Sequence, residues 1–379
     1  MVVTNLKTRT VRKVACLKTE RHYWMDLLNV IACFAVIVLH CTTSVFLNSG
    51  DFKWCVDAVL QSIFIFAVPV FFMISGANLL GYRKKYSTKD FFIKRFRRVV
   101  FALVVASIIV YIGAPLISKA ILGSPVNLSI GDFLRSFFHN EICDVYWFFY
   151  AIIGLYLITP VFSLLAENRK TLQYAIAICI TTSMLIPLIE RFLPDHSLLD
   201  LFMYPYLSSW LTYYLLGYYL VHFQKKTLNT RLLFLACLAS VFIMAAMTIK
   251  TNIGHSVASE AFAPYDGFYA NASSLFALIY SSALILLFKK TNISVKNAPI
   301  YPLIRKVSAL SLGIYAIHML IINSFDLFVP HSFVWDIVIR PFVVFAISML
   351  LAYIGTLLMK LFRKATAQIK STSPKSKEK

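Results

Sequence analysis

Charged residues are scarce in this chain, and their scarcity bounds its class. Only 14% of the 379 residues are Asp, Glu, Lys or Arg, whereas 59% are hydrophobic, and the mean hydropathy is +0.73. A soluble domain carries about 25% charged residues. The deficit excludes an ordinary soluble globular protein and predicts an all-α, polytopic membrane protein.

Several chemical signatures are absent as well. The sequence holds no HExxH pair, no Walker A loop, no GxSxG elbow and no Cys/His cluster with metal-ligand spacing. Its seven cysteines form no disulfide framework, although Cys55 and Cys143 are expected on the outer side, where an oxidising compartment would let them pair. We therefore expect no bound metal. No internal repeat and no soluble module is evident.

Long hydrophobic runs are what the chain has in abundance. Runs of about 20 residues predict ten spanning helices. These helices are expected to start near Trp24, Asp57, Arg98, Val145, Leu172, Tyr204, Arg231, Phe268, Ala309 and Phe333.

The runs also predict three regions. We expect a basic cytoplasmic N-terminus at 1–23, a membrane domain at 24–365 and a disordered Lys-rich cytoplasmic tail at 366–379. The stretch before the first run is polar and basic, and that run is long enough to span, so we expect no separate cleavable signal peptide.

The basic residues report topology. The formal net charge of +20 would suit a nucleic-acid binder, but most of the 37 Lys and Arg residues fall in alternate connections, such as 83–85 and 94–98. This positive-inside pattern predicts an even number of spans, both termini in the cytoplasm and a multi-pass location in the cell (plasma or inner) membrane. We expect no nucleic-acid partner, and the tail lysines are placed to contact anionic membrane lipid.

The first hydrophobic run contains a polar stripe. Asn29 and His40 stand eleven positions apart, about three helical turns, and Asp26 and Cys33 fall near the same stripe. An ionisable group is costly to hold in lipid, so the stripe is expected to face protein or water and to mark a functional site. A neutral imidazole accepts a proton, which makes His40 the catalytic candidate. Asp26 would also serve as a helix cap, and Cys33 as packing.

Three arginines form the second candidate site. Arg95, Arg97 and Arg98 begin the third predicted helix at its cytoplasmic end. A helix N-terminus beside guanidinium groups suits phosphate. The positive-inside rule alone also accounts for these residues, so ligand binding and topology remain alternatives here.

Four further residues are supporting candidates. Ser75 lies in 71–76, where small side chains let helix backbones approach closely. Trp147 suits an interfacial aromatic belt. Tyr315 and His318 are three residues apart on one helix face, where bridging between helices and catalysis are both open.

Six segments carry a family resemblance. In order, they are 26–40, 71–76, 94–98, 147–160, 215–218 and 311–318. Together they resemble the bacterial integral-membrane acyltransferase-3 family, which is similar to the O-acetyltransferases of surface polysaccharides. The resemblance covers nearly the whole chain.

The resemblance implies a function. A member of this family takes an acyl group, usually from acetyl-CoA on the cytoplasmic side, and passes it to a hydroxyl of a cell-surface glycan or a lipid-linked sugar precursor. His40 matches the family's essential histidine, and Arg95 matches its basic motif, with Arg97 and Arg98 beside it.

The chain departs from the family pattern at two positions. The family's arginine eleven residues before the histidine falls on Asn29, so a positive charge is missing at that level. A histidine common at the start of the fourth predicted helix falls on Val145. We still expect Asn29 and Asp26 to line the path of the donor, together with the three arginines.

Two other functions are compatible with this composition. A glycan translocator without acyltransfer activity would also combine about ten spanning helices with intramembrane polar residues, although transporters often carry internal repeats. A sensor domain would be expected to carry a soluble output module.

Overall fold

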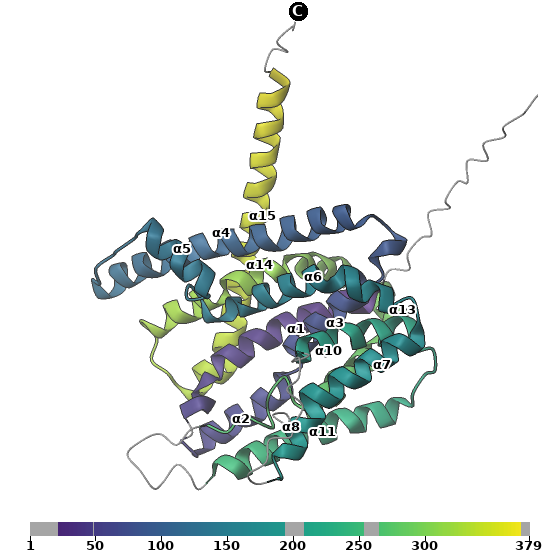
Figure 1. Ribbon diagram of the computed structural model, residues 1–379. Helices are drawn as coiled ribbons and strands as arrows, with labels where there is room; N and C mark the ends of the chain where they lie inside the picture. Colours follow the sequence, from purple (N-terminus) through teal and green to yellow (C-terminus); the bar gives the residue numbers. More distant parts are fainter. Residues whose placement is uncertain (1–21, 48, 194–207, 254–264, 373–379) are drawn as a thin grey trace, which may run out of the picture.

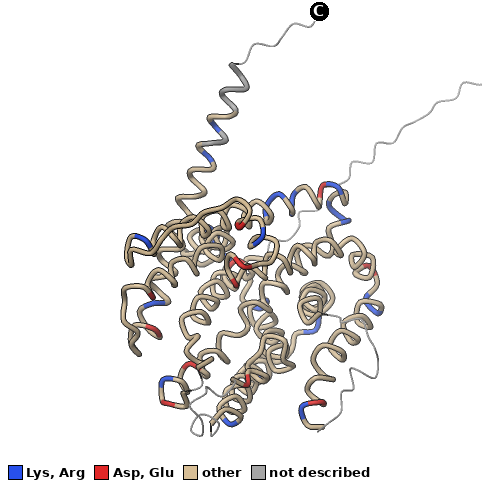
Figure 2. The backbone as a smooth tube through the Cα atoms, turned by 60° about the vertical axis from the view of Figure 1, so that its left-hand side comes forward, with Lys and Arg blue, Asp and Glu red and all other residues tan. Residues whose placement is uncertain are grey.

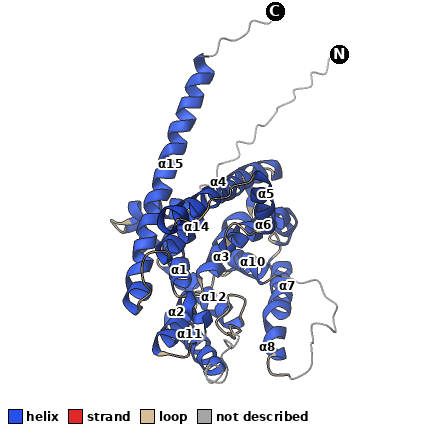
Figure 3. Ribbon diagram, turned by 90° about the vertical axis from the view of Figure 1, so that its left-hand side faces the viewer, coloured by secondary structure: helices blue, strands red, loops and turns tan. Residues whose placement is uncertain are grey.

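The architecture is helical throughout the described part of the chain. The computed structural model describes residues 22–47, 49–193, 208–253 and 265–372, and every regular element within these ranges is a helix (Figure 3). The prediction of an all-α fold is therefore confirmed.

The α-helices differ widely in length. They are α1 Tyr23–Cys41, α2 Phe52–Phe64, α3 Ala67–Leu79, α4 Thr88–Leu122, α5 Ile130–His139, α6 Trp147–Leu165, α7 Arg169–Ile180, α8 Ile186–Glu190, α10 Ser209–Tyr218, α11 Thr230–Asn252, α12 Leu275–Lys290, α13 Asn292–Asn297, α14 Tyr301–Asp326 and α15 Arg340–Thr372. The short 3₁₀ and π segments that extend or join them are η1 Thr43–Leu47, η2 Tyr82–Lys84, η3 Asp144–Tyr146, η4 Thr181–Leu185, η5 Tyr219–Phe223 and η6 Trp335–Ile339.

Eight helical stretches among the described residues are long and apolar enough to cross a membrane. They are Tyr23–Leu47, Phe52–Lys84, Thr88–Leu122, Asp144–Leu165, Arg169–Glu190, Thr230–Asn252, Tyr301–Asp326 and Trp335–Thr366. This confirms a polytopic membrane protein.

The two remaining expected spans are shorter helices. The run predicted to start near Tyr204 corresponds to α10 continued by η5, and residues 201–207 before it lie outside the described residues. The run predicted near Phe268 corresponds to α12, which has 16 residues. The orientation of the two termini stays a prediction.

The ends of α4 illustrate how the sequence sets helix boundaries. The Ser87 hydroxyl accepts a hydrogen bond from the Asp90 backbone N–H, which satisfies a donor that the first turn leaves unpaired. At the other end Gly123 adopts φ +69°, a left-handed conformation that favours glycine. Between these signals lies a helix of 35 residues, which is basic in its first turns and mostly apolar after Arg98.

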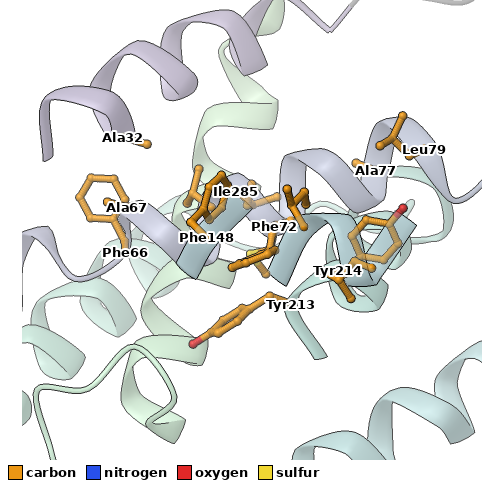
Figure 4. Close-up of a cluster of buried hydrophobic side chains, with 14 of the residues drawn as sticks. Ala32, Phe66, Ala67, Phe72, Ala77, Leu79, Phe148, Tyr213, Tyr214 and Ile285 are labelled. Carbon is orange, nitrogen blue, oxygen red and sulfur yellow. The ribbon is translucent and has the colours of Figure 1, made fainter. Parts of the chain in front are cut away.

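The packing centre is the crossing of α3 and α10. Gly76 on α3 lies so close to α10 that an added Cβ would overlap the backbone of Tyr214, and a Cβ on Gly217 would overlap the backbone of Met73. Figure 4 shows Phe72 and Tyr214 within the buried cluster around this crossing. The predicted close approach at 71–76 is confirmed, and it fixes α3 as one wall of the site described below.

Helix α14 is the second element that positions the site. It packs against α1, α4 and α15, and Figure 1 shows it between α4 and α1. Figure 2 shows charged residues mainly at helix ends and connections, with long uncharged stretches between them. The C-terminal part of α15 extends away from the other helices, and this helix continues to Thr372, past the boundary predicted at 365.

Candidate functional site

A cavity of about 520 Å³ opens between α1, α3, α4, α6 and α14. Such a volume is typical of small-molecule sites. Six of the residues predicted from the sequence line it: Asp26, Asn29, Ser75, Arg95, Arg98 and Tyr315. The structure thus brings residues from four distant segments to one hollow.

The cavity is lined by three arginines and one carboxylate. Arg95 and Arg98 are three residues apart on α4, Arg305 comes from α14, and Asp26 comes from α1. Among the described residues, Arg98 and Arg305 make no hydrogen bond or ion pair. Arg95 reaches only the Tyr86 hydroxyl, at 3.5 Å, and its buried Nε has no partner in the described part of the chain. Within the described part of the chain, the lining therefore carries more cationic than anionic side chains.

A polar seam joins α1 to α14 along one wall. Asn29 Nδ2 donates to Ser311 Oγ at 2.9 Å and to Ser308 Oγ at 3.1 Å. Ser308 Oγ donates to Asp26 Oδ1 at 3.1 Å, and the Tyr301 hydroxyl donates to Asp26 Oδ2 at 2.7 Å. The lower part of the predicted stripe on α1 therefore faces protein, and both of its polar side chains have partners on α14.

The upper end of the stripe pairs two histidines. The rings of His40 on α1 and His318 on α14 lie 5.3 Å apart between centroids, with planes tilted by 44°. His318 Nδ1 lies 2.6 Å from the Tyr315 carbonyl oxygen, and its buried Nε2 has no partner among the described residues. Because a carbonyl only accepts, this contact assigns the proton to Nδ1 and leaves Nε2 as an acceptor. Both histidines are candidates from the sequence, but their pairing is visible only in the structure.

An aromatic wall separates the cavity from this imidazole pair. Tyr315 lines the cavity, and its ring lies 5.4 Å from that of His318 and 5.1 Å from that of Phe148. The Tyr315 hydroxyl donates to the Val145 carbonyl oxygen at 2.5 Å, which holds the ring in place. Neither histidine lines the cavity: its lining ends at Tyr315 on α14, three residues before His318, and at Asn29 on α1, eleven residues before His40.

Two other predicted residues lie away from the cavity. Arg97 is exposed and does not line it, because two residues along a helix turn a side chain to roughly the opposite face from Arg95. Trp147 is 36% exposed and packs against Trp210, with ring centroids 5.0 Å apart. Arg97 therefore belongs to the basic end of α4, and Trp147 belongs to an aromatic cluster.

The remaining predictions concern the cysteines and metal binding. Cys55 and Cys143 are both free thiols, so the pairing considered above does not occur in the structure. Burial raises the pKa of Cys143 to about 11, which keeps its thiol protonated. In the described ranges, no three His, Cys, Asp or Glu side chains are grouped so as to hold a metal ion.

A second charged cluster, which the sequence did not predict, lies at the opposite end of α1. We call it the distal ion network, and it consists of Lys53, Asp57, Asp326, His331, Asp336 and Arg340. Arg340 bonds to Asp326 and lies 3.5 Å from Asp336, and Lys53 lies 3.4 Å from Asp57 and 3.5 Å from Asp336. Three of these groups are almost fully buried.

A sequence signal for the network did exist. Asp57 and Arg340 stand in or beside apolar runs, where an ionisable side chain calls for a partner. The partners lie far apart in the sequence, however, so spacing on one helix does not reveal them.

Most of the chain matches one known protein family. A family model described as an acyltransferase domain matches residues 22–361. No curated protein and no solved structure matches the chain. The matched range includes the cavity, the imidazole pair and the distal ion network.

Proposed function

Because the chain belongs to the acyltransferase-3 family, we propose that it is an integral-membrane O-acyltransferase. It moves an acetyl or another short acyl group from cytoplasmic acyl-CoA to a hydroxyl of a cell-surface glycan or its lipid-linked precursor. One observation carries the proposal: a cavity lined by arginines ends at Tyr315, one helical turn before His318, whose ring lies beside that of His40.

The cavity suits the donor. Coenzyme A presents several phosphate oxygens, and guanidinium groups bind phosphate through paired, charge-assisted hydrogen bonds. Arg95 and Arg98 offer such donors from one face of α4. Asp26 and Asn29 line the same space, and their side chains hold the α1 wall to α14.

The depth of the cavity suits an extended thioester arm. Ten residues separate Arg305 from Tyr315 on α14, which corresponds to about 15 Å along the helix axis. A donor with its phosphates among the arginines would therefore bring its thioester to the wall formed by Tyr315 and Phe148. Transfer requires this wall to open toward His40.

At His40 the chemistry is an acyl exchange. The acceptor oxygen forms a bond to the thioester carbonyl carbon while the C–S bond breaks, and the products are an ester and free coenzyme A thiol. The hydroxyl proton passes to the neutral His40 imidazole and then to the departing sulfur. A two-step route, in which His40 itself carries the acyl group, has the same overall balance.

His318 acts on this step as a positioning residue. Its Nε2 has no partner among the described residues, and a small rotation of either ring would let it accept a hydrogen bond from one nitrogen of His40, so that the other nitrogen would be free to take the acceptor proton. A His318→Gln variant keeps an acceptor and should retain a larger share of activity than His318→Leu. Equal losses in the two variants would contradict this role.

The central test uses membranes that contain the full chain and radiolabelled acetyl-CoA. The wild type should transfer label to surface glycan, and His40→Ala should lose at least about a hundredfold of this rate, the lower range for an acid–base catalyst. His139→Ala is the matched control because His139 is an exposed residue at the end of α5. Mass spectrometry of the labelled glycan would identify the acceptor.

Two outcomes would redirect the proposal. Full transfer by a normally inserted His40→Ala protein would remove His40 from catalysis. Wild-type membranes that move glycan across the bilayer without acylating it would favour a translocator.

A further inference from the structure

Arg305 is a cavity residue that no motif singled out. It lies on α14, three residues before Ser308, and its exposed side chain lines the cavity. The other cavity arginines, Arg95 and Arg98, come from α4. Cationic groups therefore enter the same space from two different helices.

Among the described residues, Arg305 has no ion-pair partner. Asp26 is the one carboxylate in the cavity lining, and both of its oxygens already accept hydrogen bonds, from Tyr301 and Ser308. In the described part of the chain, Arg305 has no ion pair or hydrogen bond. On the facing helix the amide of Asn29 is bound to α14, so α1 offers no cation at this level.

The position of Arg305 along α14 indicates which part of a donor it meets. Among the residues of α14 that line the cavity, Arg305 is nearest the start of the helix and Tyr315 is nearest the imidazole pair. A thioester that reaches Tyr315 leaves the phosphate-bearing part of its donor on the side of Arg305. In acyl-CoA that part carries the diphosphate and, beyond it, the adenosine with its ribose 3′-phosphate.

Resting on the function proposed above, we infer that Arg305 binds the ribose 3′-phosphate and makes the cavity selective for donors that carry it. The diphosphate of coenzyme A is a separate group, and it faces Arg95 and Arg98 on the other wall. Some thioesters lack the 3′-phosphate that Arg305 binds. Examples are those of dephospho-coenzyme A and of carrier-bound phosphopantetheine. Arg305 thereby gives the acyl-CoA specificity proposed above a residue of its own.

The test compares coenzyme A with dephospho-coenzyme A, which differ only in this phosphate. Binding of each is measured on the purified full chain in lipid nanodiscs. The wild type should prefer coenzyme A by about tenfold, or about 1.4 kcal/mol. Arg305→Gln should bind coenzyme A about tenfold more weakly and dephospho-coenzyme A unchanged, so the preference disappears.

Two further variants sharpen the result. Lys306→Gln removes the same charge from the next residue, which is exposed and does not line the cavity, and it should keep the full preference. Arg305→Lys keeps the charge but loses the paired donors, and it should give an intermediate preference.

The failures are distinguishable. If Arg305→Gln keeps the wild-type preference, or weakens both ligands equally, the assignment of Arg305 is overturned while the acyltransferase proposal stands. If the wild type binds neither compound, the donor assignment and the role of Arg305 both fall.

Discussion

The charged residues near the two ends of α1 differ in burial and in pairing. Beside Asn29 the arginines of the cavity are accessible and unneutralised, whereas beyond His40 the distal ion network buries its charges and pairs them. Asp57, Asp336 and Arg340 are 0%, 1% and 3% exposed. Charges removed from water require partners, so the network fixes the helices that supply it. Cations left at an open cavity are available to a ligand instead.

The largest expected effect comes from breaking the network. Arg340→Leu removes the buried cation between Asp326 and Asp336, and leaves Asp336 with the more exposed Lys53 and His331 as its partners. We expect the free energy of unfolding to fall by about 3–5 kcal/mol, measured by denaturant titration in mixed micelles. An additional Asp336→Leu change should recover part of this loss. A loss below about 1 kcal/mol for Arg340→Leu would mean that the network does not stabilise the fold.

The cavity end should depend on packing for its stability. Gly76→Ala places a methyl group into the backbone of Tyr214, and backbone cannot move aside as a flexible side chain can. Overpacking of this kind costs about 1–3 kcal/mol. Gly154→Ala is the matched control, because a Cβ there meets no atom within 4 Å. Equal stability of the two variants in the same titration would contradict the close crossing of α3 and α10.

Local patterns predicted one side of this comparison well. Helical periodicity placed Asp26, Asn29 and His40 on one stripe, and the stripe faces α14 as that pattern requires. The small residues at 71–76 predicted a close approach, because a glycine without a Cβ lets the backbone of any neighbouring helix come near. Such features are properties of a single helix.

The other side depended on tertiary packing. Lys53 meets Asp336 across almost three hundred residues, and no spacing rule links them. Arg305 became a cavity residue only because α14 packs between α1 and α4. His40 and His318 were each named from the sequence, but their pairing was not, because neither segment alone shows which helix it packs against.

Removal of a cavity charge should weaken donor binding without lowering stability. Arg98→Gln deletes an exposed cation that has no ion pair or hydrogen bond among the described residues, so the free energy of unfolding should change by less than about 0.5 kcal/mol. Binding of coenzyme A in nanodiscs should nevertheless weaken by about tenfold, because a charge-assisted contact to phosphate is lost. A loss of stability like that of Arg340→Leu would erase the distinction between the two ends of α1.

The smallest effect is expected one residue away, at Arg97. This side chain is exposed and points away from the cavity that Arg95 and Arg98 line. If donor binding depends on direct contact, Arg97→Gln should change the affinity for coenzyme A by less than about twofold, because exposed charges act only weakly through water and salt. If it instead weakens binding as much as Arg98→Gln, and the loss vanishes at high ionic strength, the basic helix end attracts the donor through its general field. The contrast between Arg97 and Arg98 therefore decides whether the cavity arginines form a site or merely a basic surface.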